Sequence, residues 1–138
     1  MSHPHPDLER AQRMLASGLT GSSRMAAWLA RSALEDGVVL RLERLGHDTR
    51  RASMRSRLTC LSVLGDECAA DAEFAWNRLS GACHQHAFEL APNASEVRAL
   101  LTQVQRLLEV SEAPPRVEVE GREASRMRTT GLNDRPRY

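Results

Sequence analysis

The sequence predicts an all-α protein, a four- to five-helix up-and-down bundle followed by a disordered C-terminal tail. Apolar residues recur at the three- and four-residue spacing of helices in several segments. Strand signals are sparse, because the chain has only five aromatic residues and no alternating apolar run before its C-terminal part. A length of 138 residues and a hydrophobic fraction of 41% suit one domain with its own core.

Five helices are expected in order along the chain, at residues 7–16, 23–45, 54–64, 66–89 and 94–110. Short polar side chains that accept a hydrogen bond from a first-turn amide are suited as caps, and they stand at Asp7, Ser22 or Ser23, Ser53 and Asn93. Gly46 and Gly65 suit the ends of the second and third helices, because glycine readily adopts the left-handed conformation found there. The last helix has the clearest apolar period, with one face formed by Val97, Leu100, Leu101, Val104, Leu107 and Leu108.

Three regions are expected: a short N-terminal helix and linker at 1–22, the bundle at 23–110, and a disordered tail at 111–138 with little apolar content. The chain begins without an apolar signal region, and no apolar run is long enough to cross a membrane. We therefore expect a cytoplasmic protein without a membrane partner. Its odd number of cysteines favours reduced thiols at Cys60, Cys68 and Cys83.

Charge is nearly balanced over the chain but not along it. The net charge of +1 excludes a protein that coats nucleic acid by bulk electrostatics. Every basic residue is arginine, which a GC-rich genome explains, with phosphate recognition as the alternative. Residues 41–57 have a net charge of +4 and residues 66–96 a net charge of −5. We expect these segments to pair, within the chain or across a dimer; the alternative is an RNA-binding patch that uses Arg50, Arg51 and Arg55.

The segment WNRLSGACHQHAFEL, residues 76–90, carries the residues best suited to chemistry. On a continuous helix, His84 lies on a polar flank together with three supporting residues. These are Glu73, Asn77 and Ser80, and the members of the flank follow one another at intervals of about one turn. A histidine can move protons, and an arginine can hold a phosphate with two hydrogen bonds. Arg78 and His84 would therefore suffice for metal-independent RNA cleavage, in which the ribose 2′-OH attacks the adjacent phosphate.

Simpler interpretations of this segment remain open. His86 falls at the edge of the apolar stripe and can be a core histidine, while His84 can merely bond Glu73 or Asn77. A zinc site would use Cys83 with a neighbouring histidine, but adjacent residues diverge by about 100° on a helix. We expect no metal and no other cofactor.

Three segments resemble HEPN (higher eukaryotes and prokaryotes nucleotide-binding) domains over residues 8–110. LARSALEDGVVLRLERLG resembles the first long helix of that family, and ASEVRALLTQVQRLL is similar to its closing helix. NRLSGACH resembles the R-x₄₋₆-H motif, here Arg78 and His84. The resemblance implies a dimerising bundle whose active members cleave RNA without metal at a dimer cleft, often as toxins paired with a nucleotidyltransferase-type antitoxin. Other members are inactive dimerisation or nucleotide-binding modules.

The apolar surface predicts self-association. The long helix at 23–45 is apolar over more than one face, and Phe74 and Phe88 lie off the core stripe of the helix at 66–89. We expect a homodimer that buries Phe74 and Phe88 close to Arg78 and His84. The residues left over on the long helix are Trp28, Leu34, Val38 and Leu42. Two functions follow: an endoribonuclease, or a non-catalytic dimeric helical partner or adaptor.

Overall fold

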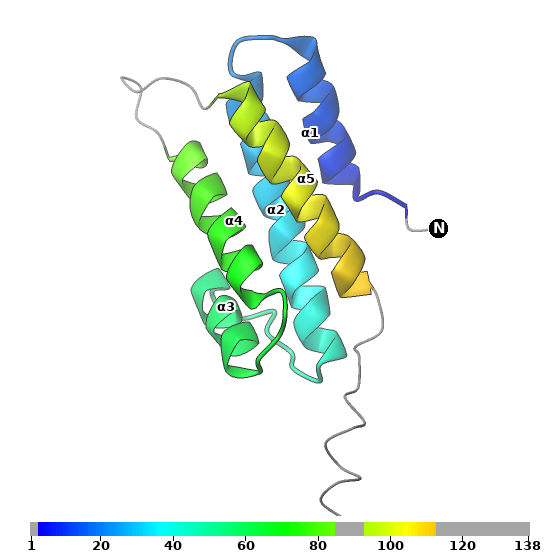
Figure 1. Ribbon diagram of the computed structural model, residues 1–138, viewed down its shortest axis with the longest axis vertical. Coiled ribbons are helices and arrows are strands. Elements are labelled where there is room, and N and C mark those ends of the chain that lie inside the picture. The colour runs from blue at the N-terminus through cyan, green and yellow to red at the C-terminus, as the bar shows by residue number, and fades with distance from the viewer. Residues whose placement is uncertain (1–2, 85–92, 113–138) are drawn as a thin grey trace, which may run out of the picture.

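The computed structural model describes residues 3–84 and 93–112, which contain helices and no strand. The five helices (Figure 1) are α1 (Pro6–Ser17), α2 (Ser22–Arg44), α3 (Met54–Val63), α4 (Ala69–Cys83) and α5 (Ala94–Glu112). The all-α class is therefore confirmed. The predicted tail beyond residue 112 and the residues His86 and Phe88 lie outside the described residues.

The four longer helices form an up-and-down bundle. In Figure 1, α1 and α4 run in one direction and α2 and α5 in the other, while α3 occupies the connection from α2 to α4. Helix α2 is central, because it contacts each of the other four helices. Among the described helices, α3 contacts only α2 and α4.

Two predicted caps are confirmed, and the α4 boundaries were wrong. Ser53 Oγ accepts the Ser56 amide at 3.1 Å, and Asn93 Oδ1 accepts the Ser95 amide at 2.9 Å. Helix α4 begins at Ala69 rather than Asp66, because Asp66 Oδ1 accepts the Cys68 amide at 2.9 Å and holds the chain in a turn. It ends at Cys83 rather than near residue 89, two residues after a glycine that weakens the last turn.

The other two predicted caps were also wrong. His5, not Asp7, caps α1, because the ring Nδ1 accepts the Asp7 amide at 3.2 Å. Gly21 stands at the N-cap of α2, in the left-handed conformation, and no side chain caps that helix. Serine side chains were expected there, but the tight turn from α1 to α2 selects a glycine backbone instead.

The core lies around α2. Three of the apolar residues expected to remain for a dimer, Leu34, Val38 and Leu42, are buried within one chain. The prediction failed because α2 is covered by α1, α4 and α5 together and so buries more than one face. Trp28, by contrast, is 52% exposed. The fully buried large side chains are Leu34, Leu42, Leu61, Leu79, Val97 and Val104.

Several arginines of the basic segment, residues 41–57, bind carboxylate or carbonyl groups of the same chain. Arg41 pairs with Asp66 at 2.9 Å in the core, so the expected pairing of basic and acidic segments occurs within the chain for this pair. Arg44 donates to the Ser111 carbonyl, and Arg57 donates to the carbonyls of the 46–53 loop. Of the five helices in the described residues, none has the length and apolarity of a membrane-crossing helix.

Two helical glycines allow a matched test of the α2–α5 contact. A Cβ at Gly37 would collide with the Leu108 side chain, whereas a Cβ at Gly81 would meet no atom. Gly81→Ala should raise the free energy of unfolding by ~0.5–1 kcal/mol through helix propensity. Gly37→Ala gains the same propensity but overpacks the contact, so it should be ~1–3 kcal/mol less stable than Gly81→Ala in urea unfolding. Equal stabilities would show that α5 does not approach α2 this closely.

Candidate functional site

The structure separates Arg78 from His84 within one chain. Arg78 lies on the outer face of α4, 5.8 Å from the Phe74 ring centroid and 3.7 Å from the Glu96 carboxylate of α5. His84 follows the last residue of α4 and faces α2. Six helical residues cover ~1.7 turns, so the two side chains point to different sides. The predicted pair could therefore meet only across two copies of the chain.

The partner of His84 is Arg31 of α2. Arg31 Nη1 lies 3.4 Å from His84 Nε2, and Arg31 Nε donates to Glu35 at 3.1 Å. The Glu35 carboxylate thereby fixes the guanidinium, one turn along the same helix. We call these residues, with the two tryptophans below, the Arg31–His84 cluster.

Two indole rings flank the guanidinium of this cluster. Its central carbon lies 5.8 Å from the Trp28 centroid and 5.5 Å from the Trp76 centroid. Trp76 Nε1 also donates to the same Glu35 oxygen at 3.1 Å, so α2 and α4 are tied together here. Cation–π contacts and the shared carboxylate hold Arg31 in a fixed orientation.

Two buried polar atoms near the end of α4 have no partner among the described residues. The Nε atom of Arg24 and the hydroxyl of Ser80 are buried without a hydrogen bond in the part of the chain that the structure describes. An unsatisfied buried polar atom is unfavourable by ~1–3 kcal/mol, so a hydrogen bond to either atom would stabilise the protein. Burial raises the pKa of the Cys83 thiol, while the charges of Arg31 and Arg24 oppose the rise. The Glu35 carboxylate, which is paired with Arg31, adds to the rise.

The supporting residues Glu73 and Asn77 do not join His84. With Arg55 and Trp76 they line a pocket of ≈ 350 Å³ between α3 and α4, which we call the α3–α4 pocket. Its remaining lining residues are Leu58, Thr59 and Ser62. In Figure 1, α3 lies beside the end at which α4 begins. Glu73 and Asn77 therefore share a pocket with α3, whereas His84, beyond the other end of α4, contacts Arg31 of α2.

The remaining predicted site residues are scattered. Arg50 pairs with Glu43 at 2.6 Å, Arg51 is exposed, and Arg55 belongs to the α3–α4 pocket. Phe74 is 54% exposed. Arg31 was missed by the sequence-based prediction because its contact with His84 joins residues 53 apart, and an arginine on a long helix gives no local signal of such a partner.

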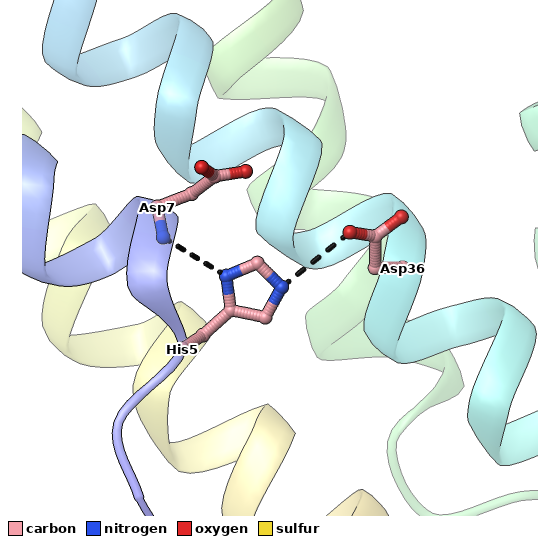
Figure 2. A group of neighbouring side chains, drawn as sticks. All are labelled: His5, Asp7 and Asp36. Carbon is pink, nitrogen blue, oxygen red and sulfur yellow. Dashed lines mark hydrogen bonds and ion pairs between the residues drawn. The ribbon is translucent and has the colours of Figure 1, made fainter.

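Three side chains have the composition of a metal site. His5, Asp7 and Asp36 place their ligand atoms within 4.8 Å of one another (Figure 2). His5 Nδ1 accepts the Asp7 amide, so the proton of the neutral ring lies on Nε2, 3.4 Å from Asp36 Oδ2. A metal on Nε2 would require that proton to move to Nδ1, against the Asp7 N–H. The geometry thus serves to cap α1 and tie it to α2, in competition with any metal ion.

Comparison of the chain with family models, with curated proteins and with solved structures gives no match.

Proposed function

We propose that this protein is a metal-independent endoribonuclease, of the kind that the HEPN resemblance implies, in which His84 moves the proton and Arg31 holds the phosphate. The observation that supports it best is the 3.4 Å approach of Arg31 Nη1 to His84 Nε2 beside the exposed ring of Trp28. A guanidinium binds a phosphodiester, an imidazole moves protons near neutral pH, and an exposed indole stacks on a base. Single-stranded RNA presents all three targets.

The chemistry needs two proton transfers. The ribose 2′-oxygen forms a bond to phosphorus while the bond to the 5′-oxygen breaks, which leaves a 2′,3′-cyclic phosphate and a 5′-hydroxyl. His84 as the neutral imidazole takes the 2′-OH proton, and Arg31 stabilises the charge on the non-bridging oxygens. The departing 5′-oxygen needs a proton from a second acid. His84 of a second copy would supply it, which is why we propose a homodimer as the active form.

Arg78 has a role in this dimer. It is 59% exposed, and its 3.7 Å pair with Glu96 is a surface ion pair of little stability. Its guanidinium can therefore leave Glu96 and contact RNA held by the other copy. The nucleotidyltransferase-type antitoxin stays a prediction from the resemblance.

A cleavage assay tests the proposal. We expect the protein to cleave a fluorophore-labelled single-stranded RNA in excess EDTA and to leave a 2′,3′-cyclic phosphate. His84→Ala and Arg31→Met should each lower the rate by ~10²–10⁴, while Arg98→Met, an exposed arginine on α5, should not. RNA with 2′-deoxyribose at the cleaved position should resist. An inactive wild-type protein, or a His84→Ala variant of equal rate, would refute the proposal.

A second candidate function is the non-catalytic dimeric partner or adaptor module. The observation that favours it is Phe74, which is 54% exposed with the Arg78 guanidinium stacked on its ring. Exposed aromatic and arginine side chains are typical of the residues that dominate protein interfaces.

Sedimentation equilibrium distinguishes the assemblies. We expect a wild-type dimer at micromolar concentration and a Phe74→Glu monomer, because the charge cannot be buried at the interface. Val63→Glu is the matched control, since Val63 is 81% exposed on α3, and it should remain dimeric. A wild-type monomer would rule out both the adaptor and the two-histidine mechanism. A dimer in which His84→Ala has no effect on RNA would favour the adaptor alone.

A further inference from the structure

The α3–α4 pocket holds donors and acceptors that the fold does not use. Within residues 3–84 and 93–112, the side chains of Arg55, Glu73 and Asn77 have no ion-pair or hydrogen-bond partner. Trp76 contributes an aromatic wall, and the volume of ≈ 350 Å³ lies at the lower end of the ligand pockets of proteins. A ligand the size of one base or nucleoside suits this space.

The charged groups specify the ligand further. A guanidinium only donates hydrogen bonds and a carboxylate only accepts them, so the ligand must offer two acceptors on one edge and two donors on another. Guanine has this arrangement: O6 and N7 are adjacent acceptors that pair with an arginine fork. Its N1–H and N2–H groups are adjacent donors that suit a carboxylate. Adenine lacks the paired donors, and the pyrimidines lack N7.

The two charges come from different helices. Arg55 lies on α3 and Glu73 on α4, so they approach the pocket from its two sides, as the two edges of a guanine require. Trp76 provides the face on which a base can stack. Asn77 adds an amide that can donate or accept beside them.

The pocket is physically connected to the Arg31–His84 cluster. Trp76 lines the pocket and also lies 5.5 Å from the Arg31 guanidinium. Along α4, Asn77 and His84 are separated by about 10 Å at ~1.5 Å per residue, a distance comparable with the length of an extended nucleotide. A strand whose base enters the pocket can thus present its phosphate to Arg31.

We propose that the α3–α4 pocket binds guanine and makes the proposed ribonuclease selective for guanine in single-stranded RNA. Arg55 contacts the O6/N7 edge, Glu73 the N1/N2 edge, and Trp76 the face of the base. This inference rests on the proposed function for its place in RNA cleavage, but the pocket itself can be tested without any cleavage.

The test is calorimetric titration of the full chain with nucleoside 5′-monophosphates. GMP should bind at least tenfold more tightly than AMP, CMP or UMP. IMP lacks the 2-amino donor, so it should bind more weakly than GMP, and Glu73→Gln should abolish that difference. Arg55→Met should lower the GMP affinity at least tenfold, while the exposed controls Arg98→Met and Glu109→Gln should leave it unchanged. Circular dichroism would verify that each variant is folded.

The outcomes separate this proposal from the proposed function. GMP selectivity that persists in an inactive protein would support the pocket and refute the ribonuclease. Cleavage without base preference, with equal binding of the four nucleotides, would refute the pocket and keep the ribonuclease, because binding would then depend on phosphate alone. Equal affinities for GMP and IMP would overturn the role of Glu73 and with it the guanine assignment.

Discussion

Asp66→Ala should lower the free energy of unfolding by ~3–5 kcal/mol, the loss expected when one partner of a buried ion pair is removed. The Asp66 and Arg41 side chains are only 4% and 7% exposed, and Arg41 Nε donates to Asp66 Oδ2 at 2.9 Å. Without the carboxylate, a guanidinium stays in the core with no counter-charge. The Cys68 amide also loses its acceptor, Asp66 Oδ1.

A surface pair is the matched control. Glu43 pairs with Arg50, whose side chain is 71% exposed, so Glu43→Gln should change stability by less than ~1 kcal/mol. Urea unfolding followed by circular dichroism measures both variants. Replacing both charges, as in Arg41→Met with Asp66→Leu, should recover much of the loss, because the unpaired charge is gone. A loss below ~1 kcal/mol for Asp66→Ala would mean that water reaches the pair.

The helices were predictable because their signals are local. The Val97–Leu107 period and the caps at Ser53 and Asn93 depend on residues within one or two turns, and the structure bears them out. The surroundings of an apolar face were not predictable. Leu34 and Leu42 have the same pattern whether α4 and α5 of the same chain or a second copy covers them, and the structure shows the former.

The candidate site shows the same division. The helical projection correctly placed Glu73 and Asn77 on α4, whereas His84 lies one residue beyond the end of that helix and does not share their surroundings. The neighbours come from other helices: α3 places Arg55 at the same pocket as Glu73, and α2 places Arg31 beside His84. These neighbours are far apart in the sequence. Their proximity depends on how the helices pack, which no local sequence pattern encodes.

Stability should fall at alkaline pH because of one buried thiol. Burial raises the pKa of Cys68 from 9.0 to about 11, with the nearby Asp66 carboxylate adding to the rise and Arg41 opposing it. The position at the N-terminus of α4 by itself favours the thiolate, so burial and the carboxylate outweigh the helix end. Above pH 9 the unfolded chain loses this proton while the folded chain keeps it. The contribution of the neutral Cys68 thiol to the free energy of unfolding is therefore complete below pH 9, and it is lost as pH rises towards 11.

The composition makes this effect measurable. The 19 basic residues are all arginines and the chain has a single tyrosine, so few other groups titrate between pH 9 and 11. Urea unfolding with a reductant at pH 8.5 and 10.5 should show ~1–2 kcal/mol more loss for the wild type than for Cys68→Ala. Cys83→Ala should remove a smaller part of the stability loss between these two pH values. Burial also raises the pKa of that half-buried thiol, but the charge of Arg31 opposes the rise. If the wild type and Cys68→Ala lose stability in parallel, Cys68 is not a buried neutral thiol beside Asp66 in solution.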